Sequence, residues 1–268
     1  MKRKLKAVIW PVIYLVLIVN VCVSFILVFR SYYYKSIFVS GSSMEPTLNG
    51  HEGNRVDYGI IDDHKSALNN LKRFQIITTY YPFSDSKDYV GGYDHEKGKD
   101  NVIDKNESSY KIKRIYGFPK ETVKFDYDKD ELENIKKRYN STDPEVKISY
   151  DQMQYELNKI IHFYTRKPGE EFVEQKISFN RRFNINRFNE YDYEHELGDD
   201  EYWVMGDNYS HSSDCHSKKA PVYKDNLVGV LIAIEGTCKI DHKTDTDIDG
   251  TKGSYTCTER KRHMPKYY

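Results

Sequence analysis

Two adjacent serines, Ser42 and Ser43, lie in the stretch "GSSMEPTL". A serine hydroxyl is a weak nucleophile until a neighbouring base removes its proton, so the first question is which base the chain supplies. The stretch follows a long apolar run closely, and taken alone it is also typical of a polar linker behind a membrane helix. Against a linker, Met44 and Leu48 are apolar and Pro46 fixes φ, which favours a packed loop.

Histidine and lysine are the two candidate bases. The stretch "HSSDCH" at residues 211–216 resembles a metal site, but its spacing does not let these side chains converge on one ion, so we expect no metal there. Lys113 lies in "YKIKRIYG", an apolar-flanked strand candidate, where burial would lower the pKa of its ammonium towards the range of a base. Strand alternation places Lys113 and Ile115 on one face and Arg114 on the other. Alone, Lys113 is also typical of a solvated strand lysine.

A third stretch, "VMGDNYSHSSDC", holds polar groups that can orient a cationic side chain. Gly-Asp-Asn after an apolar run predicts a tight turn, and Ser212 and Asp214 follow with a hydroxyl and a carboxylate. Alone, the stretch is also typical of a structural turn with side-chain-to-backbone hydrogen bonds. The chain therefore offers a nucleophile, a base and orienting groups in three separate places, which the fold must bring together.

The N-terminus predicts one transmembrane anchor. "MKRKLK" precedes an uncharged apolar run at residues 7–29, which as a helix spans roughly 30 Å of hydrocarbon. The run is too long for the apolar region of a cleaved signal peptide, and bulky aromatics follow it where small residues would be needed. Four cations precede the run, against Arg30 and Lys35 close behind it. This bias places the N-terminus in the cytoplasm and the rest of the chain on the outer face.

The remainder predicts a mainly β chain with one helical insertion. Strand candidates rich in β-branched and aromatic residues cover 74–81, 110–117, 201–208 and 226–236. Apolar residues recur at helical spacing between residues 129 and 165, which predicts helices there. The expected units are an anchor at 1–30, a β core at 31–127 and 197–240, an inserted cap at 128–196 and a polar, basic tail at 241–268. The charged segment 84–109 predicts a loop.

Composition narrows the function classes. The formal net charge is zero, which gives no electrostatic reason to expect nucleic acid as a partner. Of the cysteines, Cys22 lies in the anchor, while Cys238 and Cys257 flank a polar loop and either pair or stay reduced. That leaves Cys215 as a free thiol.

The three stretches, in this order behind a single anchor, resemble the type I signal peptidases of bacteria, in particular the Gram-positive type. "GSSMEPTL" is similar to the family's G-x-S-M-x-P-T-L box, "KRIYGFP" to K-R-x-x-G-x-P, and "GDNYSHSSD" to G-D-N-R-x-x-S-x-D. The later "PVYKDNLVGV" resembles the segment that closes the family's core. The resemblance implies a mainly β fold, with an antiparallel β-sheet catalytic core and the α-containing insertion as a cap. It also implies a membrane-bound Ser/Lys endopeptidase that removes signal peptides from exported preproteins.

The resemblance assigns roles to individual residues. Ser43 would be the nucleophile and Lys113 the general base, and the backbone N–H of Ser43 would bind the oxyanion. Ser212 would hydrogen-bond to Lys113 and orient it. Asp214 would be a structural carboxylate, with Arg114 as its partner.

Several positions depart from the family pattern. Gly41 stands where part of the family has a hydroxyl that helps to bind the oxyanion, so the second oxyanion donor is not identified. Tyr209 replaces the usual arginine after G-D-N, and "DCH" at 214–216 replaces D-S-R. The usual P-G-D after the lysine box is "PKE" at 119–121. These changes affect the charge pairing around the site more than the Ser/Lys pair.

The implied partners are the signal peptides of secreted preproteins, membrane lipid and the protein translocation machinery. No cofactor and no metal are implied, and the location is the plasma membrane, with a single pass. One alternative is a Ser/Lys protease of the self-cleaving repressor type, against which the anchor argues. The other is a catalytically inactive, membrane-tethered binding protein of the same fold, which would require the loss of Ser43 or Lys113.

Overall fold

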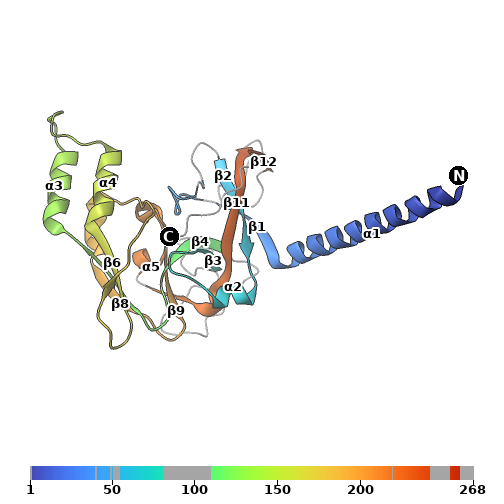
Figure 1. Cartoon of the computed structure of the whole chain (residues 1–268). Helices are drawn as coiled ribbons and strands as arrows, with labels where there is room; N and C mark the ends of the chain where they lie inside the picture. Colours follow the sequence, from blue (N-terminus) through green and yellow to red (C-terminus); the bar gives the residue numbers. More distant parts are fainter. Residues whose placement is uncertain are drawn as a thin grey trace.

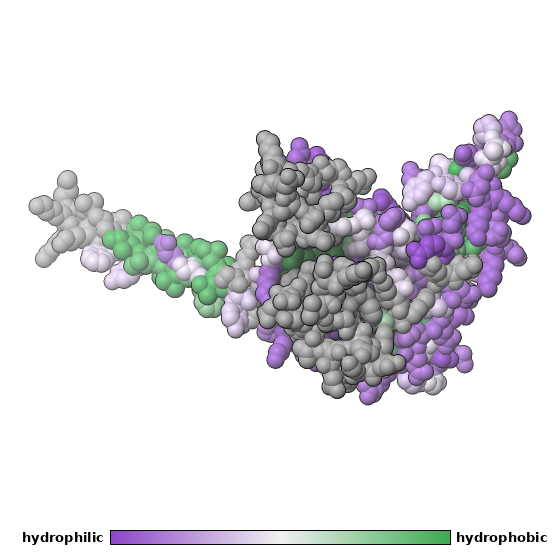
Figure 2. All heavy atoms as spheres, turned by 180° about the vertical axis from the view of Figure 1, so that it is seen from behind, coloured by the Kyte–Doolittle hydropathy of each residue, from purple (hydrophilic) through white to green (hydrophobic). Residues whose placement is uncertain are grey.

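The computed structural model of the chain describes residues 2–39, 41–48, 50, 55–80, 110–218, 220–241 and 254–259. Its first element is α1 (Lys2–Tyr33), which extends away from the rest of the chain as one helix (Figure 1). Within α1, Trp10–Val28 has a mean hydropathy of 2.7, and its apolar side chains are exposed, as Figure 2 shows. By length and composition α1 can cross a membrane.

The first sheet contains strands from both ends of the sequence. Its members are β1 (Tyr34–Phe38), β2 (Arg55–Asp62), β3 (Ile76–Tyr80), β4 (Tyr110–Gly117), β9 (Glu201–Met205), β10 (Val222–Tyr223), β11 (Leu227–Asp241) and β12 (Ser254–Glu259). Their order is β1-β2-β11-β3-β4-β9-β10, and β12 pairs with β11. All of these pairs are antiparallel. The predicted mainly β class with an antiparallel sheet and one N-terminal apolar helix is confirmed.

A second, smaller antiparallel sheet lies beside the first and carries two helices (Figure 1). Its strands, in the order β7-β6-β5-β8, are β5 (Thr122–Tyr127), β6 (Ile161–Arg166), β7 (Val173–Glu174) and β8 (Tyr193–Glu196). Its helices α3 (Lys129–Tyr139) and α4 (Tyr150–Ile160) begin at side-chain caps, Asp128 and Ser149. The remaining short helices are α2 (Lys65–Asn69), η3 (Ile185–Tyr191), η4 (Tyr209–His211), α5 (Cys215–Lys218) and η5 (Lys224–Asn226).

The second sheet extends beyond the predicted insertion at 128–196 on its N-terminal side. β5 begins at Thr122 and pairs with β6 and β8, both of which lie inside the predicted insertion. β5 and β6 form strands because buried and partly exposed residues alternate along them, with Val123, Phe125 and Phe163 fully buried. In the sequence, the helical period between these strands is longer and clearer than the period-2 alternation of the strands themselves.

One continuous apolar core joins the two sheets. Phe74 and Tyr116 from the first sheet region contact Phe163 from the second in edge-on ring pairs, and Tyr116 also lies against Phe125. A separate apolar cluster, which we call the loop cluster, joins strands of the first sheet to residues 39–48. Its members are Val39, Met44, Leu48, Ile61, Ile76, Ile112, Leu231 and Ile234.

The predicted polar tail at 241–268 is only partly described. Residues 254–259 form β12, which pairs with β11 and extends the first sheet. Cys238 on β11 is disulfide-bonded, and β12 contains Cys257. Among the described residues, Cys22 and Cys215 form no disulfide. The remaining tail residues and the predicted loop 84–109 lie outside the described residues.

Candidate active site

The stretch 41–48 is a packed turn. The side chains of Met44 and Leu48 are buried in the loop cluster. Backbone hydrogen bonds close the turn, among them those from Glu45 N to the Ser42 carbonyl at 3.1 Å and from Leu48 N to the Met44 carbonyl at 3.0 Å. The prediction of a packed loop rather than a flexible linker is confirmed, and its two apolar anchors fix where the serines lie.

Lys113 reaches Ser43 from the middle of β4. Its strand position pairs with Ile77 on β3, and its side chain is only 3% exposed. Nζ of Lys113 donates a hydrogen bond to Oγ of Ser43 at 2.9 Å. Burial lowers the pKa of Lys113 from 10.5 to about 8, although the nearby carboxylates of Asp214 and Asp207 act in the opposite direction. A buried amine of this kind, next to a hydroxyl, can act as a general base.

The Gly-Asp-Asn turn after β9 holds residues 41–48, which we call the serine loop, by hydrogen bonds to the carbonyl groups of Ser42 and Ser43. Asn208 N donates to the Ser43 carbonyl at 3.0 Å, and Asn208 Nδ2 donates to the Ser42 carbonyl at 3.0 Å. Gly206 makes this approach sterically possible. A Cβ at Gly206 would lie 2.3 Å from the Ser43 carbonyl oxygen and 2.5 Å from Ser212 Oγ, which is closer than atoms can pack.

The Arg114 side chain lies on the opposite face of β4 and forms a buried ion pair. Its Nε and Nη2 donate to the two carboxylate oxygens of Asp207 at 2.9 and 2.6 Å, and both side chains are fully buried. Arg114 Nη1 also donates to the Phe74 carbonyl at 2.7 Å. The predicted pairing of Arg114 with Asp214 is therefore wrong, because the carboxylate that faces Arg114 is the earlier one, in the turn itself.

Asp214 lies near Lys113 instead. Its carboxylate accepts hydrogen bonds from the backbone N–H groups of Gly206 at 2.8 Å, His216 at 3.1 Å and Ser217 at 3.3 Å. Burial raises the pKa of Asp214, and the charge of Lys113 opposes that rise. Asp214 thus organises the turn and adds negative charge beside the lysine.

Ser212 lies close to the pair but does not hydrogen-bond to the lysine. Its Oγ is buried against Gly206, whereas the amine of Lys113 is directed to Ser43. The predicted hydrogen bond from Ser212 to Lys113 is therefore not formed in the structure. Both side chains act on Asp214 instead, since the charge of Lys113 and a hydrogen bond from Ser212 each lower the pKa of that carboxyl.

Comparison with known proteins identifies the family. The family model described as "Signal peptidase, peptidase S26" matches residues 11–234. The chain belongs to this family. No curated protein matches the chain significantly. The match begins inside α1 and ends in β11, so it includes all three stretches and the second sheet. The resemblance to signal peptidases is thereby confirmed, and the chain is a member of a peptidase family.

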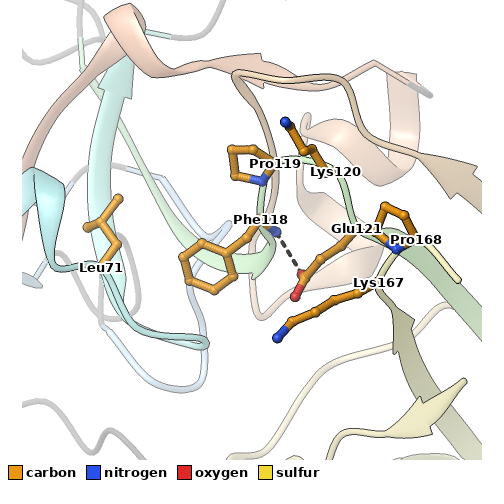
Figure 3. A pocket seen from close by; sticks show the side chains of 7 residues that line it. All are labelled: Leu71, Phe118, Pro119, Lys120, Glu121, Lys167 and Pro168. Atoms are coloured by element: carbon orange, nitrogen blue, oxygen red, sulfur yellow. Dashed lines mark hydrogen bonds between the residues drawn. The ribbon is translucent and has the colours of Figure 1, made fainter. Parts of the chain in front are cut away.

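The departures from the signal peptidase pattern have local structural explanations. Lys120 adopts φ +67° at the position where the family usually has glycine, in a conformation that side chains rarely take. Glu121 at the next position is buried; it accepts a hydrogen bond from Phe118 N at 2.9 Å and pairs with Arg73 at 2.7 Å. Figure 3 shows this turn beside a pocket of about 490 Å³, which Leu71 and Phe118 also line.

The stretch "HSSDCH" is used for packing. The ring of His216 is buried and stacks on that of Tyr191, with centroids 4.5 Å apart, while His211 is exposed. Cys215 is buried, and its Sγ accepts a hydrogen bond from the backbone N–H of Val204 at 3.2 Å. The replacement of D-S-R by "DCH" therefore places a ring and a thiol in the core.

Sequence reasoning treated two important residues as turn formers only. Asp207 and Asn208 hold Arg114 and the serine loop, and the signal that could have found them was their place in the G-D-N box. A third residue, Arg182, contacts Glu45 on the serine loop from inside the inserted cap. No sequence pattern marked that contact.

Proposed function

We propose that this signal peptidase family member is a serine endopeptidase that uses Ser43 as nucleophile and Lys113 as general base. The observation that carries the proposal is the 2.9 Å hydrogen bond between Lys113 Nζ and Ser43 Oγ, made by a buried lysine with a pKa of about 8. An ordinary lysine is almost fully protonated at neutral pH and cannot accept a proton. Burial lowers the pKa of Lys113, so that part of the lysine is neutral near pH 8 and can accept the serine proton.

The reaction proceeds through an acyl-enzyme. Neutral Lys113 takes the proton of Ser43 Oγ as the oxygen attacks the scissile carbonyl carbon, and the oxyanion that forms is bound by the backbone N–H of Ser43. The lysine ammonium then gives its proton to the amide nitrogen, the C–N bond breaks, and an ester to Ser43 remains. A water molecule, deprotonated by Lys113, attacks the ester, and the proton returns to Ser43 Oγ.

The substrates that fit this arrangement are the signal peptides of secreted preproteins. The helix α1 is long and apolar enough to anchor the chain, and the N-terminal cations favour a cytoplasmic N-terminus with the catalytic part on the outer face. A signal peptide occupies the same membrane with its apolar segment, so anchoring brings the site close to the cleavage point. Residues with small side chains, such as alanine, at positions −1 and −3 are the expected specificity.

A preprotein cleavage assay with the full chain in detergent or vesicles tests the proposal. Ser43→Ala and Lys113→Ala should each abolish processing, whereas Ser42→Ala, which removes the neighbouring hydroxyl, should retain it. Processing by either of the first two variants would contradict the mechanism. The alternative of an inactive binding protein predicts that the wild-type chain binds signal peptides and releases them uncleaved.

A further inference from the structure

A short segment of the inserted cap, Arg181–Phe183, is held in an extended conformation by α4. Asn158 Oδ1 accepts from Arg181 N at 3.0 Å, and Asn158 Nδ2 donates to the Arg181 carbonyl at 2.7 Å. Gln154, one helical turn earlier, makes the same pair of contacts with Phe183, both at 2.8 Å. Two side-chain amides thus take the place of a neighbouring strand and fix both ends of the segment.

The backbone of Arg182, between these two residues, forms hydrogen bonds with the Gly-Asp-Asn turn and the residue that follows it. Its N–H donates to the Asp207 carbonyl at 2.9 Å, and its carbonyl accepts from Tyr209 N at 2.8 Å. This forms a parallel β-bridge between Arg182 and Asn208. Asn208 donates to the Ser43 carbonyl, so the cap is connected to the backbone of Ser43 through one intervening residue of the turn.

The side chain of Arg182 makes a second, independent connection. Its Nη1 donates to Glu45 Oε2 at 2.7 Å, and Glu45 lies two residues after Ser43. The Glu45 side chain is only 10% exposed and that of Arg182 is 32% exposed, so the pair is partly shielded from water. Arg182 is therefore linked to the backbone around Ser43 in two ways. Its backbone bridges to Asn208, which binds the Ser43 carbonyl, and its side chain binds Glu45 on the serine loop.

We infer that Arg182 is a positioning residue, through which the inserted cap fixes Ser43 Oγ against Lys113. The inference rests on the proposed Ser/Lys function. Arg182 contacts neither reacting side chain, so its loss should slow the chemical step and leave substrate binding nearly unchanged. Small displacements of a nucleophile cost up to about 100-fold in rate, so we expect Arg182→Gln to lower kcat by about 10- to 100-fold with little change in KM.

The kinetic experiment compares Arg182→Gln and Glu45→Gln with a matched control, Arg138→Gln. Arg138 pairs with Glu156 inside the same cap, with side chains 26% and 19% exposed, and that pair does not contact the serine loop. Arg182→Gln and Glu45→Gln should lower kcat, and the double variant should be no worse than the poorer single one, because both break the same link. Arg182→Lys keeps the charge and should recover part of kcat. Full additivity, or losses no larger than those of Arg138→Gln, would overturn the inference.

A second readout does not depend on proteolysis. In a Ser43→Cys chain, the thiol next to the Lys113 ammonium should have a lowered pKa, measured from the pH dependence of alkylation by iodoacetamide. A Ser43→Ala chain reports the background from other cysteines. Adding Arg182→Gln should raise the thiol pKa towards its ordinary value, and adding Arg138→Gln should not. An unchanged thiol pKa in the Arg182 variant would refute the positioning role.

The two readouts separate the two proposals. If the wild-type chain cleaves no preprotein, the proposed function fails, yet the thiol titration still decides whether Arg182 positions residue 43. If cleavage is normal and the thiol pKa is insensitive to Arg182, only the positioning role fails. Thermal unfolding of each variant checks that the cap is folded, and Glu45→Gln, which preserves volume and removes one charge, provides the test if Arg182→Gln unfolds.

Discussion

Raising the pH converts Lys113 from an ammonium to an amine, and we expect the cleavage rate to follow that titration. The pKa of Lys113 is lowered to about 8 because its side chain is buried beside Ser43. Only the amine can take the serine proton, so kcat/KM should be proportional to the neutral fraction of the free enzyme. Acidic conditions should therefore inactivate the enzyme reversibly without unfolding it.

The magnitude follows from the pKa. With a pKa of about 8, the neutral fraction is about 1% at about pH 6 and about half at about pH 8, so kcat/KM should rise about 50-fold over that interval. Above that, the curve should flatten, with only about a twofold further gain up to about pH 10. A solvated lysine, with its ordinary pKa of 10.5, would instead give a rise of about 75-fold between about pH 8 and pH 10.

The assay is preprotein cleavage by the detergent-solubilised full chain under kcat/KM conditions, at constant ionic strength across this range. Far-UV circular dichroism at each pH separates loss of base from loss of fold. A rate that climbs without a plateau to pH 10 would show that Lys113 is not desolvated in the working enzyme. A flat profile would show that Lys113 is not the base.

Two further predictions concern stability, each measured by denaturant unfolding. The pKa of Lys113 is about 8 in the folded chain and 10.5 when solvated, so the unfolded chain binds more protons between these values and stability rises with pH across that window. Lys113→Met should therefore stabilise the chain by about 3 kcal/mol below about pH 8, and the gain should vanish near pH 10.5; a loss at neutral pH would contradict the burial argument. Asp207→Asn leaves the buried guanidinium of Arg114 without its charged partner and should cost about 3–5 kcal/mol, whereas a cost within about 0.5 kcal/mol would show that the pair is not buried in solution.

The sequence predicted the parts of this protein that local patterns encode. The apolar run at residues 7–29 identified a helix able to cross a membrane, because length and hydropathy alone decide that property. Alternation in "YKIKRIYG" placed Lys113 and Arg114 on opposite faces of β4, and the structure gives them different partners, Ser43 and Asp207. Met44 and Leu48 marked a packed turn, and both are buried.

The extent of the cap was harder to predict. Its helices follow a clear 3.6-residue period, but β5 and β8 are short and pair with segments far along the chain. A strand of four to six residues has too few alternations to stand out when its partner is not known. β12 at residues 254–259 was not predicted either, because its polar sequence has no strand pattern of its own and forms a strand by pairing with β11.

The sequence by itself determined which chemistry is available: a serine, a lysine with apolar neighbours, a glycine turn and an apolar helix long enough to cross a membrane. Only the tertiary structure decided how these groups meet. Two carboxylates, Asp207 and Asp214, lie close together in sequence, and the register of β4 against β9 and the course of the turn decide that Arg114 takes the first. The link from Arg182 to Glu45 joins residues far apart in the chain and has no sequence signature. Such contacts depend on where separate strands and turns lie in space, and local sequence periodicity carries no information about that.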